Sequence, residues 1–168
     1  KAPLYLAGQC KAWHAVDPRI HLVVVGPPLD YALFERVTEA AADPGSGLRY
    51  HPAVPHPDLL RAMSEADLLV NSSVSEGQSN AILEAMAVGT PVVARRNEGN
   101  ASLVEHRESG LLFDSPAQFE AAARELLADE ALRAALVQRA LSDVNTRHGV
   151  AAEARAYAGL LARATASA

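Results

Sequence analysis

The chain has 168 residues, 49% of them hydrophobic, which is enough apolar material for one domain with its own core. Its formal net charge of -5 excludes a broadly basic surface, so we expect neither nucleic acid nor an anionic membrane as a partner. No apolar run approaches the roughly 20 residues that cross a membrane, and the one cysteine, Cys10, has no second thiol for a disulfide. We therefore expect a cytoplasmic domain with Cys10 buried. Because the chain begins at Lys1 rather than at methionine, we also expect a fragment or a processed chain.

Short apolar runs, many of them β-branched and bounded by Gly, Pro or polar residues, predict the strands. The clear runs are residues 20–25, 67–71 and 91–94, and the weaker ones are residues 48–50 and 110–113. Helical spacing of apolar residues predicts helices over residues 3–16, 29–42, 57–65, 80–88, 116–128, 129–144 and 150–164. Alternating strands and helices indicate an α/β domain over residues 1–168, with a Rossmann-like parallel sheet flanked by helices and additional C-terminal helices.

The most informative segment is residues 72–99. A polar loop containing Gly77 follows the strand that ends near Asn71, and a helix then begins at Ser79 or Asn80. Ligands of open α/β sheets bind at the carboxyl ends of the strands, and the first N–H groups of a helix attract anions. This loop and helix start therefore predict a phosphate site that needs no cationic side chain.

Two glutamates frame this segment, with seven residues between them. Glu76 lies in the loop, and Glu84 lies within an otherwise apolar helical stretch. A carboxylate accepts hydrogen bonds from sugar hydroxyls, and a glutamate among apolar residues is unusual unless it has a partner. The alternative is structural: Glu76 caps the helix and Glu84 faces solvent.

These residues carry a resemblance to the retaining glycosyltransferases of family 4, which belong to glycosyl transferases group 1 and have the GT-B fold. The carboxyl-terminal domain of that family carries the motif E-G-F-G-x-x-x-x-E-A-x-A-x-G-x-P-V-V-A, followed by a Gly-rich turn and E-I-V. The matching positions here are Glu76, Gly77, Glu84, Ala85, Ala87, Gly89, residues 91–94, Gly99, Val104 and Glu105. Residues 71–77 also resemble the pattern N-S-S-x-S-E-G of glycosyltransferase 1 domain-containing proteins. The resemblance spans roughly residues 1–127.

The resemblance implies a role for each matching residue. Glu76 would lie against the donor sugar as the catalytic-site carboxylate, and Glu84 would accept hydrogen bonds from the ribose hydroxyls of the nucleotide. The backbone N–H groups that meet the sugar and phosphates would be those of Gly77, Gln78, Ser79 and Asn80. Lys1 corresponds to a lysine that clamps the diphosphate, although a terminal residue is also prone to fray.

The chain departs from the family pattern in two places and lacks part of it. Gln78 and Ser79 replace an aromatic-glycine pair, and residues 97–99 replace a double glycine. The acceptor-binding N-terminal domain of the family, and the first strand of this domain, have no counterpart in the sequence. This chain alone would then have no acceptor site.

The expected function is therefore that of the donor-binding half of a retaining glycosyltransferase, which moves a sugar from a nucleotide-diphosphate sugar to an acceptor hydroxyl. The family reaction needs no metal, so we expect no metal site and no cofactor beyond the donor. Two alternatives stay open: a non-catalytic nucleotide-sugar-binding or assembly module, and a nucleotide-sugar epimerase of the GT-B type.

Other polar residues have both a functional and a plain interpretation. His51 and His56 flank a loop that resembles one near the nucleotide base in the family, and without a third ligand at useful spacing they do not predict a metal site. Arg95 and Arg96 follow a predicted strand at its carboxyl end, where an arginine can bind phosphate or remain solvated.

Overall fold

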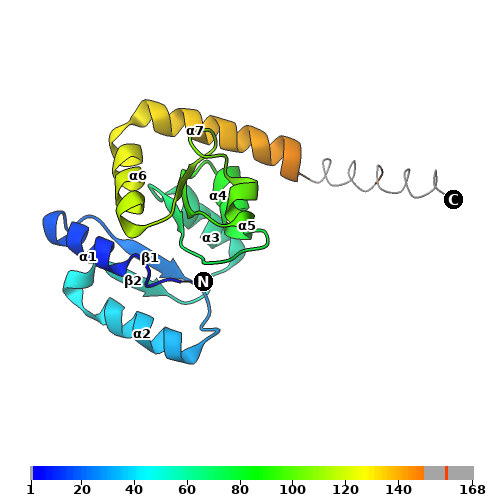
Figure 1. Cartoon of the computed structure of the whole chain (residues 1–168). Helices are drawn as coiled ribbons and strands as arrows, with labels where there is room; N and C mark the ends of the chain where they lie inside the picture. The colour runs from blue at the N-terminus through cyan, green and yellow to red at the C-terminus, as the bar shows by residue number, and fades with distance from the viewer. Residues whose placement is uncertain (1, 150–157, 159–168) are drawn as a thin grey trace.

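The computed structural model describes residues 2–149 and residue 158. Lys1 lies outside the described residues, and so does the helix predicted over residues 150–164, apart from Ala158. The described chain is an α/β domain in which parallel strands are flanked by helices, which confirms the predicted fold class (Figure 1). Among the described residues, no helix is both long and apolar enough to span a membrane.

The strands and helices follow the predicted order, except that the helix Glu98–Leu103 was not predicted. The strands are β1 (Leu22–Val25), β2 (Leu48–His51), β3 (Leu69–Asn71), β4 (Val92–Arg95) and β5 (Leu111–Phe113). The helices are α1 (Ala7–Val16), α2 (Tyr31–Ala42), α3 (His56–Ser64), α4 (Asn80–Ala87), α5 (Glu98–Leu103), α6 (Pro116–Ala128) and α7 (Glu130–Asp143). A short 3₁₀ turn, Pro44–Ser46, precedes β2, and a π-helical turn, Val144–His148, follows α7.

The first helix is shorter than predicted. Residues 3–6 form turns, held by the backbone bonds from Tyr5 N–H to the Ala2 carbonyl (3.1 Å) and from Ala7 N–H to the Leu4 carbonyl (3.2 Å). The helix itself begins at Ala7. These bonds join residues three positions apart, whereas the bonds of an α-helix join residues four positions apart. The apolar pattern therefore runs on through residues 3–16, but the α-helical hydrogen bonding does not.

The strands are divided between two parallel sheets. β1 pairs with β2, with Val24 opposite Tyr50, and β3, β4 and β5 form a second sheet with β4 in the middle. No ladder joins β1 to β3 among the described residues. Each of these two strands therefore has one edge whose N–H and C=O groups are not used in a described sheet.

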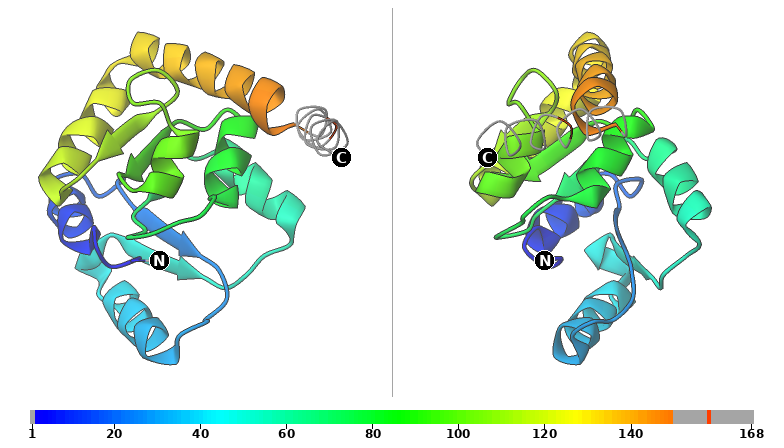
Figure 2. Two further views of the ribbon diagram at one scale, coloured as in Figure 1. Left: turned by 45° about the vertical axis from the view of Figure 1, so that its right-hand side comes forward. Right: turned by 90° about the vertical axis from the view of Figure 1, so that its right-hand side faces the viewer.

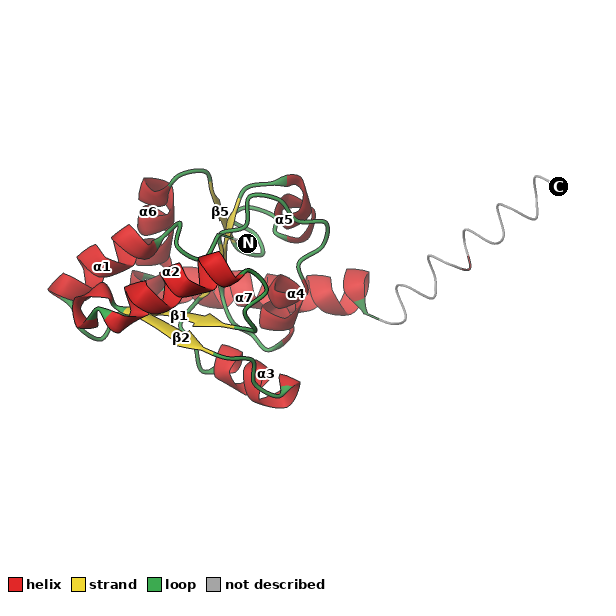
Figure 3. Cartoon of the chain, turned by 90° about the horizontal axis from the view of Figure 1, so that it is seen from below, coloured by secondary structure: helices red, strands yellow, loops and turns green. Residues whose placement is uncertain are grey.

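Helices cover one face of the β1–β2 pair. α1 and α2 lie on the side that carries Leu48 and the Tyr50 ring, which meets Phe34 of α2 edge to face at 5.4 Å between centroids (Figure 3). On the opposite face, Val23 and Val25 remain 50% and 38% exposed. The alternation of exposure along β1 is the pattern of a strand covered on one side.

The main core lies between the second sheet and the helices at both ends of the chain. Phe113 of β5 is fully buried, and the Phe119 ring lies between Phe113 and Trp13 of α1, at 5.4 and 5.9 Å between centroids. Leu6 and Leu126 complete this cluster. Cys10 is buried, as predicted, and its thiol contacts the Gly47 carbonyl oxygen.

Candidate functional site

The predicted ligand loop, residues 72–79, joins the carboxyl end of β3 to the first residue of α4. It lies beside the loop that leads from β4 into α5, so two strand-to-helix loops lie side by side at one edge of the sheet (Figure 2). Parallel strands bring their carboxyl ends to the same edge, which is where ligands of such sheets bind. The structure therefore places the predicted loop at the edge suited to a ligand.

A buried amide holds the loop. The Asn71 Nδ2 group donates to the Ser79 hydroxyl at 2.9 Å and lies 3.4 Å from Glu76 Oε1, while Asn71 Oδ1 accepts from the Ser73 N–H at 3.0 Å. Asn71, Ser73 and Ser79 are all buried. One side chain at the end of β3 thus fixes both ends of the loop and the Glu76 carboxylate, a contact that the sequence did not predict.

The start of α4 is left without a side-chain cap. Ser79 is the N-cap residue, but its hydroxyl points inward to Asn71 and makes no capping bond to the helix. α1 and α3, which follow Leu6 and Pro55, also lack a side-chain cap, whereas α2, α5, α6 and α7 are each capped by the side chain of the residue before them: Asp30, Asn97, Ser115 and Asp129. The Ile82 N–H bonds to the Ser79 carbonyl at 3.1 Å, which leaves the Asn80 and Ala81 N–H groups at the start of α4 available to an anion that approaches from the loop.

Gly99 holds the loop from the other side. A Cβ atom at this position would overlap the carbonyl group of Glu76 and would lie 2.6 Å from the carbonyl oxygen of Gly77. The two backbones thus touch where a side chain would separate them. Only glycine permits this approach without a backbone shift.

The Gly99 contact comes from a helix that the sequence analysis did not predict. Residues 98–103 match a Gly-rich turn by resemblance, but the structure forms α5 there. The Asn97 side chain caps α5 by accepting from the Asn100 N–H at 2.9 Å, and it also donates to the Ser73 carbonyl at 3.0 Å. The signal for this helix was present in Asn97 and Glu98, an N-cap residue followed by an acidic first turn.

Two polar atoms of this buried network have no partner among the described residues. They are the Ser73 hydroxyl oxygen and Asn100 Oδ1. Asn100 is fully buried, and its amide donates to the Arg95 carbonyl at 2.8 Å. Leaving a buried acceptor unpaired costs about 1–3 kcal/mol, so the loop is held in place at some expense in stability.

Glu84 has a specific partner. Its Oε1 lies 2.9 Å from Nε2 of His56, the first residue of α3, and the Glu84 side chain is 28% exposed. The neighbouring Ile82, Ala85 and Met86 of α4 are buried, so Glu84 lies at the margin between the core and solvent. The Glu84 carboxylate is therefore partly exposed and hydrogen-bonded to a neighbouring helix, rather than fully solvated.

The remaining predicted residues differ in their surroundings. Gly77, Gln78 and Asn80 are exposed, and the side chains of Gln78 and Asn80 make no hydrogen bond within residues 2–149. Lys1 lies outside the described residues. Ala2, the residue that follows Lys1, is close to the site, because the Ser72 hydroxyl donates to the Ala2 carbonyl at 2.7 Å.

The two arginines at the carboxyl end of β4, its last residue Arg95 and the following Arg96, both have partners. The Arg95 guanidinium carbon lies 4.2 Å from the centroid of the Tyr5 ring, a cation–π contact, and Arg96 pairs with Asp114 at 3.3 Å. Among the described residues, no group of three or more His, Cys, Asp and Glu side chains could hold a metal ion.

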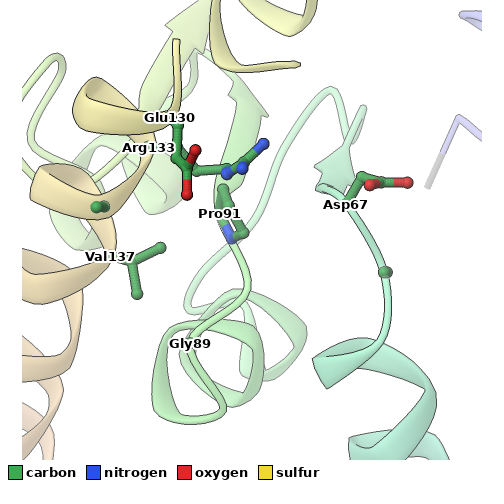
Figure 4. Close-up of a pocket in the computed structure, with 8 residues that line it drawn as sticks. Asp67, Gly89, Pro91, Glu130, Arg133 and Val137 are labelled. Atoms are coloured by element: carbon green, nitrogen blue, oxygen red, sulfur yellow. The ribbon is translucent and has the colours of Figure 1, made fainter. Parts of the chain in front are cut away.

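A hollow of about 350 Å³ lies at the opposite edge of the sheet, near the amino ends of β3 and β4 (Figure 4). Asp67 faces it from one side, and Glu130 and Arg133 of α7 face it from the other (Figure 4). It is separate from Glu76, Glu84 and the start of α4, so it has no part in the candidate site.

Solved structures share this fold. The structure of Alr3699/HepE from Anabaena in complex with UDP-glucose matches 94% of this chain and 46% of that chain, with a TM-score of 0.78 and 22% identity. The sucrose-phosphate synthase of Thermosynechococcus elongatus matches 98% of this chain and 43% of its own, with a TM-score of 0.80 and 24% identity. These similarities show the fold of GT-B glycosyltransferases.

Curated relatives are similar in sequence. Glycosyltransferase 1 domain-containing protein 1 of Xenopus tropicalis is 35% identical over 161 residues, which cover 96% of this chain and 46% of the relative. The D-inositol 3-phosphate glycosyltransferase of Acidothermus cellulolyticus is 37% identical over 133 residues, 76% of this chain and 30% of the relative. The chain thus spans less than half the length of these two relatives. The family described as glycosyl transferases group 1 matches residues 2–129, and the chain belongs to that family.

Proposed function

We propose that this chain is the donor-binding half of a retaining glycosyltransferase, which moves a hexose from a nucleotide-diphosphate sugar to an acceptor hydroxyl. The observation that carries the proposal is the uncapped start of α4, where the Ser79 hydroxyl bonds to Asn71 instead of the helix, in the segment between Glu76 and Glu84 of the sequence. The family, and the UDP-glucose bound in the Alr3699/HepE structure, support a nucleotide sugar as the ligand.

In this proposal the loop and the helix start bind the diphosphate. The N–H groups of residues 77–80 would donate to the phosphate and sugar oxygens, and Glu76, placed by Asn71, would lie against the donor sugar. As the bond to the sugar breaks, negative charge grows on the leaving diphosphate. Fixed N–H donors and the helix dipole stabilise such charge without reorganisation, so we propose that no metal is required.

Glu84 is proposed to bind the ribose. An ionised carboxylate only accepts hydrogen bonds, and the two neighbouring ribose hydroxyls are donors. Oε1 of Glu84 is already bonded to His56, and Oε2 has no hydrogen bond within residues 2–149. The second oxygen is therefore open to a ligand hydroxyl.

We also propose that the parent protein supplies the missing strand and an acceptor-binding domain from its N-terminal side. Ala2 lies at the carboxyl ends of the strands, by its bond to Ser72, and α1 then leads back to the start of β1. A helix that enters a parallel strand in this way is usually the second part of a β-α-β crossover. A parallel strand before residue 2 would lie between β1 and β3 and use their unpaired edges, and Lys1 would follow it at the diphosphate.

The test is calorimetric titration of the full-length polypeptide that contains these residues with UDP, GDP and ADP. One nucleotide is expected to bind, and Glu84→Ala is expected to weaken it about tenfold or more, because two hydrogen bonds to the ribose are lost. Glu39→Ala is the matched control, since Glu39 is an exposed helical glutamate of α2.

Two outcomes would contradict this function. Binding of none of the three nucleotides at millimolar concentration would exclude a donor site. Conversion of the sugar donor at the same rate with and without an acceptor would instead indicate an epimerase or a hydrolase.

A further inference from the structure

The hydrogen bond between His56 and Glu84 joins two helices that are far apart in the sequence. His56 Nε2 and Glu84 Oε1 are 2.9 Å apart and are separated by 28 positions along the chain. Because a carboxylate carries no proton to give, Nε2 must be the donor in this pair. It is the one hydrogen bond that the Glu84 side chain makes within residues 2–149.

The backbone around His56 is restricted. Pro55 is the N-cap residue of α3 and Pro57 is the second residue of the helix, so the torsion angles on both sides of His56 are limited by proline rings. At the other end of α3, the Thr90 hydroxyl donates to the Met63 carbonyl at 2.7 Å and fixes α3 to the segment before β4. The histidine is thus presented from a firmly held position.

Glu84 needs such a partner to bind a ligand well. A glutamate side chain loses rotamer freedom when it becomes fixed, and this loss of entropy is unfavourable. If that loss occurs on ligand binding, the affinity falls, whereas a side chain that is already fixed avoids it. The buried neighbours of Glu84 on α4 provide packing but no hydrogen bond to the carboxylate.

We propose that His56 is a positioning residue of the donor site: it fixes the Glu84 carboxylate through Oε1, so that Oε2 is presented to the ribose hydroxyls. This inference rests on the proposed function and extends it to a residue outside the family motif. His56 itself does not contact the ribose in this arrangement, and its effect on binding passes through Glu84.

The test compares nucleotide binding by the wild-type full-length polypeptide and by four variants: His56→Ala, His56→Gln, Arg61→Ala and Glu84→Gln. UDP, GDP and ADP are the probes, each beside its 2′,3′-dideoxy analogue. His56→Ala is expected to lower the affinity for the nucleotide that binds by about fivefold to tenfold, because the Glu84 side chain regains rotamer freedom in the unbound protein. His56→Gln is expected to retain most of the affinity, because its amide N–H can still donate to Oε1.

The dideoxy analogue separates positioning from general damage. It has no ribose hydroxyls for Glu84, so the ratio of the His56→Ala affinity to the wild-type affinity is expected to be close to one. Arg61→Ala is the matched control, because Arg61 lies on the same helix, is exposed and pairs with Glu65. It is expected to bind like the wild type.

Two results would overturn the inference while leaving the proposed function intact. One is wild-type binding that Glu84→Gln weakens but His56→Ala does not. The other is a His56→Ala loss of equal size for the nucleotide and its dideoxy analogue. Failure of the wild type to bind any of the three nucleotides would overturn the proposed function as well.

Discussion

The two sheets of this domain are built from similar apolar strands but are covered differently. β4 and β5 are buried along almost their whole length, on both faces, whereas exposure alternates along β1. The buried polar network of Asn71 and Asn100 and the Gly99 contact all belong to the second sheet. The candidate diphosphate loop is thus attached to the better packed region, which suits a site that must hold fixed N–H donors in place.

The β1–β2 pair contributes differently. Its strands carry α2 and lead into α3, whose first residue, His56, reaches Glu84. The less covered region therefore provides one partner for the site, while the better covered region provides the loop. Variants in matched pairs, one from each region, can test this division.

The largest difference is expected in stability. Val93→Ala removes two methyl groups from a fully buried position in the middle of β4, and we expect a loss of about 2–3 kcal/mol in the free energy of unfolding. Val23→Ala in β1 removes the same groups from a side chain that is 50% exposed, and we expect less than about 1 kcal/mol. Urea unfolding of both variants measures the difference, and equal losses would refute the contrast between the two regions.

The next effect is at Gly99. Gly99→Ala is expected to displace the Glu76 and Gly77 backbone, to lower the stability by about 1–3 kcal/mol and to weaken nucleotide binding at least tenfold. Gly8→Ala in α1 is the matched control from the other end of the chain. No atom lies within 4 Å of its Cβ position, so the change is expected to stabilise by about 0.5–1 kcal/mol. Thermal unfolding and calorimetry check both expectations.

At Asn71 a similar loss of stability is expected, with a smaller effect on nucleotide binding than at Gly99. Asn71→Ala removes the donor to Ser79 and the contact to Glu76, and we expect a loss of about 1–3 kcal/mol because buried groups are left unpaired. Nucleotide binding should weaken as the loop loosens. If Asn71→Ala bound the nucleotide as tightly as the wild type, the amide would have no role in shaping the site.

The smallest expected effect depends on pH. Burial, followed by the nearby Arg96 and Arg107 charges, lowers the pKa of His106 below its ordinary value of 6.5, and His106 Nδ1 accepts a hydrogen bond from the Leu112 N–H. The unfolded chain therefore binds a proton at His106 at a higher pH than the folded chain does. This contribution to stability is complete above pH 6.5 and is lost as the pH falls through the folded pKa. His106→Asn should show a smaller fall in Tm over that interval, and an identical fall in both proteins would contradict the assignment.

Local patterns predicted much of the fold. The runs that became β4 and β5 were recognisable because strands buried on both faces have continuous apolar sequence. α5 was missed because Gly99 and Asn100 also suit a turn, and the helix depends on the Asn97 cap and on a contact with the loop. The sequence could not show that two separate sheets would form, since strand pairing is a long-range property.

The site was predicted only in part. Glu76, Glu84 and the helix start could be named as candidates because they follow one another in a short segment. The partner of Glu84 lies 28 positions away, and no local pattern links His56 to it. Ser79 was also unpredictable in detail, because a serine at the start of a helix ordinarily caps it, whereas here a buried asparagine takes its hydroxyl.

The inward turn of Ser79 has a practical consequence for finding the natural ligand. A missing cap leaves a helix less stable by about 0.5–2 kcal/mol, and an anion that occupies the start of α4 restores that stabilisation on binding. Any ligand that binds only the folded protein raises its melting temperature. At a ligand concentration one hundred times the dissociation constant, the free energy of unfolding rises by about 2.7 kcal/mol. Thermal denaturation in the presence of a panel of nucleotide sugars would therefore test the proposed function and rank these ligands by their affinity.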